Sequence, residues 1–343
     1  MALLEVSDLH VSFKTSDGIV QAVRGVSFQV EAGQTLGIVG ESGSGKSVST
    51  QTIMGLTRGA RISGQALFEG KDLLTMGRQE MQKVRGAKVG MIFQDPLSSL
   101  HPYYRVGWQI VEMIRQHDKE TSKAQAKARA VELLTLVGIP QPDRRVNDFP
   151  HQFSGGMRQR AMIAMAMALN PKMLIADEPT TALDVTVQAQ VLRVIRNLQE
   201  RFGTAVVLIT HDLGVIADVA DQVVVMYAGG VMEQADLRTI FFANHHPYTE
   251  GLLQSLPAYG GERKRLQPIP GQPPSLISLP PGCPFSPRCR YVMDRCRTEQ
   301  PPLAPVGGDV THLSACWLPH DVAARDELRR RITGQTLPAP AGS

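Results

Sequence analysis

The chain has 343 residues, of which 43% are hydrophobic and 20% charged, so it is long enough for two domains with buried cores. Its formal net charge of +4 is small for this length and does not indicate a nucleic-acid-binding protein. No apolar run approaches the roughly 18 residues of a transmembrane helix, and the first residues carry acids rather than Lys or Arg, so neither a membrane span nor an export signal is expected.

Strand-like and helical stretches alternate up to about residue 250, which is typical of α/β domains. A mainly helical insertion is expected over about 95–168, in which Thr121 or Ser122 caps a helix that Gly138 ends. No internal repeat is found, so a single copy of the α/β unit is expected. The expected strands cover residues 26–30, 35–39, 89–93, 173–177, 205–210 and 222–227.

A phosphate-binding loop is the strongest motif in the chain. Residues 40–47 read Gly-Glu-Ser-Gly-Ser-Gly-Lys-Ser and fill every fixed position of the pattern G-x-x-x-x-G-K-[ST], between an apolar strand and a helix over 48–56. Glycines let successive N–H groups curl around phosphate oxygens, and the helix N-terminus adds partial positive charge. We expect Lys46 to reach the outer phosphates of a nucleoside triphosphate and Ser47 to ligate Mg²⁺. The expected ATP-binding residues are Gly40, Glu41, Ser42, Gly43, Ser44, Gly45, Lys46 and Ser47.

Two carboxylates follow the apolar strand 173–177. Asp177 at the strand end can hold Mg²⁺ through water, and Glu178 can polarise the water that attacks the γ-phosphate. A solvated turn is the alternative for an Asp-Glu pair. It is disfavoured because four apolar residues precede the pair and Pro179 follows it.

A second anion-binding helix start lies at residues 153–160, which read Phe-Ser-Gly-Gly-Met-Arg-Gln-Arg and continue as a helix to Leu169. Ser154 is a natural N-cap, and the two glycines after it let the backbone approach an anion. Such a site exceeds the needs of one nucleotide. It is explained if it serves a nucleotide that another copy of the unit holds.

At this point the chain resembles the ABC-type ATPases over about residues 3–250. Ser154-Gly-Gly-Met-Arg-Gln looks like their signature motif, which closes over ATP bound by the facing subunit of a head-to-tail dimer. The resemblance implies a P-loop ABC-type nucleotide-binding domain with a RecA-like core, an antiparallel β subdomain and a helical subdomain. The signature residues that it implies are Ser154, Gly155, Gly156 and Met157.

The same resemblance implies roles for single residues. Gln94 resembles the Q-loop glutamine that touches metal and water and senses the transmembrane partner. Asp184, in Thr181-Ala-Leu-Asp, resembles the D-loop aspartate, and His211 the switch histidine that contacts the γ-phosphate. Phe13 is the candidate for the aromatic that stacks on adenine, although a strand Phe is more often a core residue. The implied catalytic set is Lys46, Gln94, Glu178 and His211, and the implied Mg²⁺ ligands are Ser47, Gln94 and Asp177.

Composition changes near residue 250, because 15 of the 23 prolines and all four cysteines lie beyond it. We therefore expect an ATP-binding domain over 1–250 and a small four-cysteine domain over 251–343. His246-Pro-Tyr-Thr, the stretch 280–289 and the Q-loop extension 94–102 resemble ATP-binding subunits of dipeptide and oligopeptide permeases. That family also has nickel- and glutathione-importing relatives.

This resemblance implies a bacterial ATPase that powers import of di- or oligopeptides through separate membrane subunits. The implied partners are a second, related but different ATPase chain, two transmembrane permease subunits and a periplasmic or extracellular binding protein, with no nucleic acid. The chain would lie peripherally on the cytoplasmic face of the plasma (inner) membrane. Nickel or glutathione as the substrate, a homodimer, and a soluble ABC-type ATPase acting on nucleic acid remain alternatives. A non-catalytic scaffold is disfavoured because the catalytic set is intact.

The cysteines Cys283, Cys289, Cys296 and Cys316 have the spacing C-x5-C-x6-C-x19-C. A reducing compartment argues against stable disulfides, and a small proline-rich domain gains stability from a metal. Zinc sites usually use closer pairs, whereas a four-thiolate iron–sulfur cluster accepts wider spacing. In peptide-importer ATPases this pattern is associated with a [4Fe–4S] cluster, so we expect one here in a structural or redox-sensing role. Zinc, and free thiols or disulfides, remain alternatives.

Overall fold

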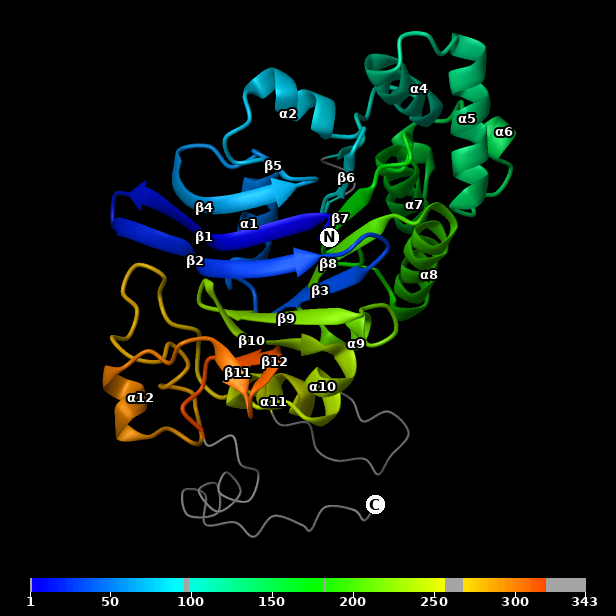
Figure 1. Ribbon diagram of the computed structural model, residues 1–343. Helices are drawn as coiled ribbons and strands as arrows, with labels where there is room; N and C mark the ends of the chain where they lie inside the picture. Colours follow the sequence, from blue (N-terminus) through cyan, green and yellow to red (C-terminus); the bar gives the residue numbers. More distant parts are fainter. Residues whose placement is uncertain (1, 96–98, 182, 257–267, 319–343) are drawn as a thin grey trace.

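The computed structural model describes residues 2–95, 99–181, 183–256 and 268–318, and Figure 1 shows their arrangement. An N-terminal antiparallel sheet has the strand order β2-β1-β4-β5. It packs beside a larger mixed sheet, as the α/β reading with an antiparallel β subdomain predicts. The strands of the N-terminal sheet are β1 (Leu4–Thr15), β2 (Gly18–Val30), β4 (Ala60–Phe68) and β5 (Lys71–Asp72).

The larger sheet has eight described strands in the order β11-β12-β10-β9-β3-β8-β7-β6. From β9 to β6 all neighbours are parallel, whereas β10, β12 and β11 add antiparallel strands at the other edge. The expected strands at 35–39, 173–177, 205–210 and 222–227 have the predicted bounds. The strands are β3 (Thr35–Val39), β6 (Val89–Ile92), β7 (Met173–Asp177), β8 (Ala205–Thr210), β9 (Gln222–Tyr227), β10 (Gly230–Asp236), β11 (Ala304–Val306) and β12 (Asp309–Ser314).

Two hydrophobic cores lie on opposite faces of the large sheet, because successive strand residues point to opposite faces. On β7, Leu174 and Ala176 join one core, whereas Met173 and Ile175 join the other. The first core contains the helices of the helical layer and the C-terminal part of the chain. The second contains the N-terminal sheet with α1 (Lys46–Ile53) and α2 (Arg78–Val84). The interior residues of the parallel strands are therefore mostly apolar, which is why the sequence shows apolar runs there.

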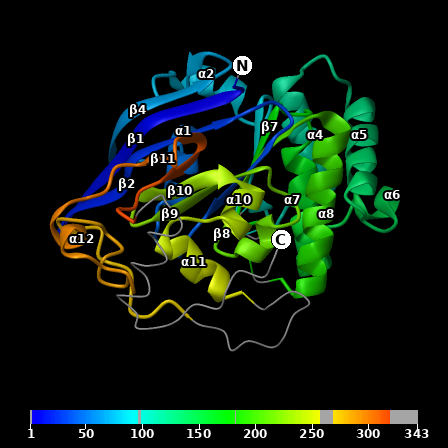
Figure 2. The same cartoon turned by 60° about the horizontal axis from the view of Figure 1, so that its bottom comes forward.

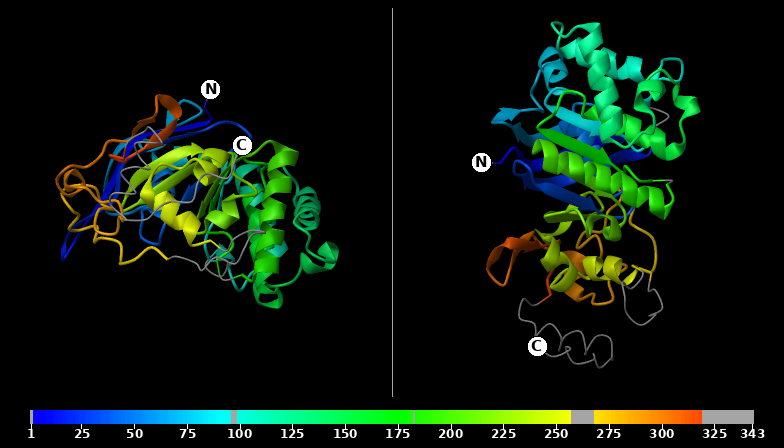
Figure 3. Two further views of the ribbon diagram at one scale, coloured as in Figure 1. Left: turned by 90° about the horizontal axis from the view of Figure 1, so that it is seen from below. Right: turned by 90° about the vertical axis from the view of Figure 1, so that its right-hand side faces the viewer.

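A helical layer occupies one end of the molecule, as both panels of Figure 3 show. Ser122 caps α5 and forms a capping box with Gln125, and Gly138 follows the helix with φ of 72°, so the predicted start and stop are confirmed. Ser154 caps α7 by accepting from the Met157 N–H at 3.3 Å. The layer contains α4 (Val106–His117), α5 (Lys123–Leu136), α6 (Pro142–Arg145), η1 (Pro150–Gln152), α7 (Gly155–Ala166) and α8 (Val185–Phe202).

The C-terminal part of the chain shares the large sheet with the preceding residues. Residue 250 lies within α11, and β12 pairs with β10, so the division at 250 stays a prediction and the two parts adjoin closely. Figure 2 brings this side of the molecule forward. The remaining helices are α9 (Leu213–Ile216), α10 (Leu237–Phe242), α11 (Pro247–Gln254) and α12 (Asp294–Thr298).

A buried carboxylate ties these parts together. Glu233 on β10 is fully buried and accepts from the backbone N–H groups of His245 at 2.5 Å and His246 at 3.1 Å. His312 on β12 lies 2.7 Å from the same carboxylate through Nε2. Because the buried carboxylate has these hydrogen-bonding partners, it stabilises the packing of β10 against β12 and against the residues before α11. Within the described part of the chain, no helix has the length and apolar character needed to cross a bilayer.

Candidate functional site

The predicted catalytic segments meet at one edge of the large sheet. The phosphate loop follows β3, Gln94 follows β6, Glu178 follows β7 and His211 follows β8. These four strands are parallel and adjacent, so their carboxyl ends lie side by side, where open α/β sheets bind ligands. Topology thus gathers residues that the sequence separates by more than a hundred positions.

Backbone geometry explains the glycines of the phosphate loop. Gly45 has φ of 96°, and a Cβ there would lie 2.3 Å from the Ala22 carbonyl oxygen. A Cβ on Gly40 would lie 2.0 Å from the Met226 carbonyl oxygen. Neither position admits a side chain, because such approaches are shorter than any van der Waals contact. The loop therefore follows a path that only glycine allows.

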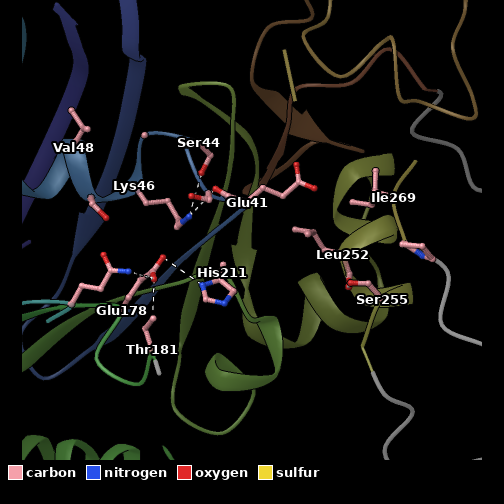
Figure 4. Close-up of a pocket in the computed structure, with 16 residues that line it drawn as sticks. Glu41, Ser44, Lys46, Val48, Glu178, Thr181, His211, Leu252, Ser255 and Ile269 are labelled. Carbon is pink, nitrogen blue, oxygen red and sulfur yellow. Dashed lines mark hydrogen bonds and ion pairs between the residues drawn. The ribbon is translucent and has the colours of Figure 1, made fainter. Parts of the chain in front are cut away.

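Lys46 is buried beneath the loop that it terminates. Its Nζ donates to the carbonyl oxygens of Gly40 at 2.7 Å and Glu41 at 2.9 Å. Figure 4 shows Lys46 beside Glu41 in the loop. Burial lowers the pKa of Lys46, and the carboxylates of Glu178, Asp177 and Glu41 act in the opposite direction. The ammonium group is thus held inside the loop, where an anion can replace backbone carbonyls as its partner.

Asp177 lies against the first helix after the loop. It accepts from the Ser47 hydroxyl at 2.7 Å and from Gln51 Nε2 at 3.4 Å. Burial raises the pKa of Asp177 above its usual range, and the two hydrogen bonds oppose that rise. A hydroxyl and a carboxylate in contact beside a phosphate site form the oxygen donor set that Mg²⁺ takes, with phosphates and waters completing its shell. The residues present therefore fit Mg²⁺.

Glu178 lies at the centre of a polar group. It accepts from Thr181 Oγ1 at 2.9 Å and from Gln94 Nε2 at 3.1 Å, and His211 Nδ1 lies 3.5 Å from its other oxygen. Its φ is 46°, a left-handed conformation that is uncommon for a residue with a side chain. Strained residues of this kind gather at active sites, where the surrounding structure holds them.

One cavity of about 730 Å³ joins these groups. The phosphate loop, Gln94, Glu178, Thr181 and His211 line one side of it. Leu252, Ser255, Pro268 and Ile269, from the C-terminal part of the chain, line the other, and Figure 4 shows Leu252, Ser255 and Ile269 facing the loop across the opening. The sequence carried no signal for this second wall. The hydrogen bond from Thr181 to Glu178 was also missed by the sequence analysis. The separation of only three residues was the signal that could have indicated it.

Three other predicted groups lie apart from this cavity. Gly155, beyond the Ser154 cap, is exposed at the start of α7, and Asp184 caps α8 by accepting from the Val187 N–H at 2.9 Å. Phe13 is half-buried on β1, opposite Val20, and packs against the second core. None of these lines the cavity. Their roles toward a nucleotide therefore stay predictions.

The four cysteines line a single small cavity, which His246, Phe285 and Trp317 also border. Burial raises the pKa of Cys283 to about 11 and that of Cys289 to about 12, and it raises the pKa of Cys316 further. No disulfide joins these described thiols. Over residues 2–318 without the undescribed gaps, no three His, Cys, Asp or Glu side chains are placed to hold a metal ion. The cluster expected from the spacing therefore stays a prediction.

Comparison with known proteins gives two family matches. A profile described as "ABC transporter" matches residues 23–181, and one described as "Oligopeptide/dipeptide transporter, C-terminal region" matches residues 232–296. The chain is 54% identical to the oligopeptide transport ATP-binding protein OppD of Bacillus subtilis over 330 residues, covering 95% of this chain and 91% of that protein. It is 51% identical to the dipeptide transport ATP-binding protein DppD of Lactococcus lactis over 318 residues, covering 92% and 90%.

Solved structures show the same fold. A dimeric ATP-binding cassette in a post-hydrolysis state, bound to ADP and phosphate, superposes with a TM-score of 0.62 at 28% identity, covering 68% of this chain and 99% of that one. A cassette from Clostridium perfringens, part of an ABC transporter complex, has a TM-score of 0.60 at 27% identity, covering 70% and 90%.

Proposed function

The chain belongs to the family of ATP-binding subunits of oligopeptide and dipeptide ABC transporters, and on that premise we propose that it hydrolyses ATP to drive the import of short peptides. The observation that carries this function is the meeting of Lys46, Glu178 and His211 around one cavity. Asp177 lies behind the cavity wall, in contact with the Ser47 hydroxyl. The chain's C-terminal match to the peptide-transporter region favours peptides over nickel or glutathione as the cargo.

ATP binding is assigned to the loop at residues 40–47. Its N–H groups surround the phosphates, and Lys46 exchanges its carbonyl partners for phosphate oxygens. Mg²⁺, when bound with ATP, neutralises phosphate charge, and Ser47, Asp177 and Gln94 are the residues that would hold it. Phe13 is the proposed adenine contact.

Glu178 is the proposed general base of hydrolysis. Its carboxylate is oriented by Thr181 and Gln94 on one oxygen and by His211 on the other side, so it presents a fixed acceptor for a proton of the attacking water. His211 and Lys46 then stabilise charge on the γ-phosphate. A preorganised group of this kind needs little rearrangement during the reaction.

Two ATPase subunits act together in this proposal. Each nucleotide would lie between the phosphate loop of one subunit and the signature residues Ser154, Gly155, Gly156 and Met157 of the other, with Asp184 at the seam. The exposure of the α7 start supports this assignment, because its N–H groups have room for an anion. The second subunit is proposed to be a related but different chain.

The remaining partners follow from the same premise. We assign the chain to the cytoplasmic face of the plasma (inner) membrane, where two transmembrane permease subunits would dock near Gln94 and a periplasmic or extracellular binding protein would deliver the peptide. ATP would favour the closed dimer through its higher affinity for that state, and hydrolysis would reopen it.

A [4Fe–4S] cluster is proposed at Cys283, Cys289, Cys296 and Cys316. The support is the type and number of the donors, four thiols that border one cavity. Burial raises the pKa of Cys283, Cys289 and Cys316, so these thiols are protonated without a metal and binding would release protons. The segment 251–343 would then be a small domain that the cluster stabilises. The cluster takes no part in hydrolysis, because the nucleotide site is complete without it.

A reconstituted transporter tests the function. The chain, its second ATPase and the two membrane subunits would be placed in vesicles with the peptide-binding protein. Peptide should stimulate ATP turnover and accumulate inside the vesicles, and Lys46→Ala should abolish both. Stimulation by nickel or glutathione and not by peptides would reject the proposed cargo.

A further inference from the structure

The phosphate loop contains a carboxylate that hydrolysis does not use. Glu41 is the first variable residue of the loop, and Figure 4 shows its side chain extending from the loop toward the side on which Leu252 and Ile269 lie. There it meets Arg288, whose two terminal nitrogens donate to its two oxygens at 2.5 and 2.9 Å. This is a bidentate pair between residues 247 positions apart.

Arg288 is held from several directions. Its side chain is only 4% exposed, it donates to the Pro270 carbonyl oxygen at 2.9 Å, and it lies 3.3 Å from the Tyr227 hydroxyl. The guanidinium also lies over the Tyr227 ring, 5.7 Å from its centroid. These contacts restrict the rotamer of Arg288, so its guanidinium is already oriented for the two hydrogen bonds to Glu41.

The backbone of Glu41 is held by the same region. Its N–H donates to the Tyr248 hydroxyl at 2.9 Å, and its carbonyl oxygen accepts from Lys46 at 2.9 Å. Tyr248 is fully buried on α11. Tyr248 therefore holds the main chain of Glu41 and Arg288 holds its side chain, next to Lys46.

The negative charge of Glu41 would affect ATP binding. A carboxylate in a phosphate-binding loop repels the triphosphate, and partial burial of the Glu41 side chain weakens the screening of that repulsion. The guanidinium of Arg288 cancels the charge and directs the carboxylate away from Lys46. Removing the arginine would leave Glu41 as an uncompensated, partly buried anion beside the bound phosphates.

We propose that Arg288 is a positioning residue for ATP binding, which neutralises Glu41 and so makes the four-cysteine segment part of the nucleotide site. Arg288 directly precedes Cys289, so whatever orders the cysteine segment also sets this contact. The alternative is a purely structural ion pair that joins two parts of the fold. The inference rests on the proposed ATP-binding role of the loop at residues 40–47.

The two readings differ in a double-mutant cycle on the full-length chain. Arg288→Met should weaken MgATP affinity about tenfold, the equivalent of about 1.4 kcal/mol, because the carboxylate is left free. Glu41→Gln alone should change it by no more than about threefold, and Glu41→Gln with Arg288→Met should recover affinity to about the same level, because no charge remains to repel phosphate. A purely structural tie predicts instead that Glu41→Gln weakens MgATP affinity as much as Arg288→Met does, because either change breaks the pair.

Arg290→Met is the matched control, since Arg290 lies two residues further along, is exposed and contacts Gln254 instead of the loop. It should bind MgATP as the unaltered chain does. Arg288→Lys keeps the charge and should retain most of the affinity, which separates loss of charge from loss of folding. In the assembled transporter, Arg288→Met should raise KM for ATP and leave kcat unchanged, because the lost interaction is the same in ground and transition states.

Several results would overturn the inference. These are unaltered affinity in Arg288→Met, an equal loss in Arg290→Met, equal losses in the Lys and Met variants at 288, or a double variant no better than Arg288→Met. Lys46→Ala separates this from failure of the site itself. If Lys46→Ala binds MgATP normally, the loop is not the ATP site, whereas a silent Arg288→Met with a defective Lys46→Ala rejects only the role of Arg288.

Discussion

At the residue scale, the proposed hydrolysis depends on the carboxylate of Glu178, whose two oxygens have different neighbours. Thr181 and Gln94 bind one oxygen of Glu178, and His211 approaches the other. Two donors on one oxygen direct the remaining lone pairs toward the cavity. Orientation of the base by neutral groups leaves its negative charge available for a proton.

Glu178→Gln should lower ATP turnover by about 10² to 10⁴-fold, the usual contribution of a general base, while leaving ATP binding intact. The amide has nearly the shape of the carboxylate but cannot accept a proton. ATPase rate and nucleotide affinity measured on the assembled transporter would check this. Glu200→Gln, an exposed position on α8, is the control and should hydrolyse normally. Hydrolysis by the Glu178 variant near the unaltered rate would assign the base elsewhere.

His246 makes stability depend on pH. It caps α11 by accepting from the Tyr248 N–H at 3.0 Å, and complete burial lowers its pKa to about 4. Below an unfolded pKa of about 6.5 the unfolded chain takes up a proton that the folded chain refuses, so stability falls as the pH falls from there toward 4. Glu233 acts in the same direction at lower pH, since hydrogen bonds such as that of His312 overcome its burial and lower its pKa.

His246→Asn should remove part of this dependence, because Asn keeps the cap and does not titrate. Between about pH 7 and about pH 5, the unaltered chain should lose about 2 kcal/mol more than the variant. Urea unfolding of both proteins at the two pH values measures the difference. His151→Asn, at an exposed position, should behave as the unaltered chain. Equal pH dependence in all three proteins would show that His246 titrates normally in the folded state.

At the scale of single elements, the start of α4 presents an aromatic surface beside the Q-loop. Tyr103, Tyr104 and Trp108 are 82%, 45% and 47% exposed, and the rings of Tyr104 and Trp108 stack with centroids 4.3 Å apart. The stacking holds the rings of Tyr104 and Trp108 in place while both side chains stay exposed to solvent. Clustered exposed aromatics of this kind are typical of protein contact sites. Residues 96–98, which join Gln94 to this surface, lie outside the described residues.

A photo-crosslinker at Tyr103 should therefore attach to a cytoplasmic loop of a membrane subunit in the assembled transporter. The same probe at Phe242, 84% exposed on α10, is the control for exposure alone and should give no such product. Mass spectrometry of the cross-linked peptides identifies the partner. Products formed only with the other ATPase chain would place the membrane contact on a different surface.

At the scale of the whole molecule, the chain after residue 250 is integrated with the proposed ATP site. It adds strands to the large sheet, contributes Leu252 and Ile269 to the nucleotide cavity and carries the cysteines on the same segment. Because the two parts of the chain share one sheet and one cavity, we expect a change in the structure of the cysteine segment to alter the phosphate loop.

The cluster can be tested on the protein purified without oxygen. Visible absorbance of an iron–sulfur protein, with about four iron and four sulfide per chain, is the expected result. Cys283→Ser and Cys296→Ser should each reduce the iron content, because four thiolates are needed. A colourless protein with one zinc per chain, or four thiols that all titrate in the native state, would exclude the cluster.

Much of the site was predictable because its signals are local. The loop at residues 40–47, the apolar run before Asp177 and Glu178, and the caps at Ser122 and Ser154 each depend on neighbours within a few positions. Local patterns reflect backbone geometry, hydrogen-bonding capacity and burial, which neighbouring residues largely determine. The same reasoning placed four of the six expected strands at their observed bounds.

The sequence by itself thus determined the α/β core and the phosphate loop, and it named the side chains that we propose for catalysis. Only the tertiary structure decided that β12 joins β10, that Leu252 and Ile269 border the cavity at the phosphate loop, and that Arg288 meets Glu41. These contacts join positions far apart in the chain, so no local periodicity or residue spacing predicts them. They arise when the folded sheet brings distant surfaces together, and burial then makes an unpaired charge at such a contact costly.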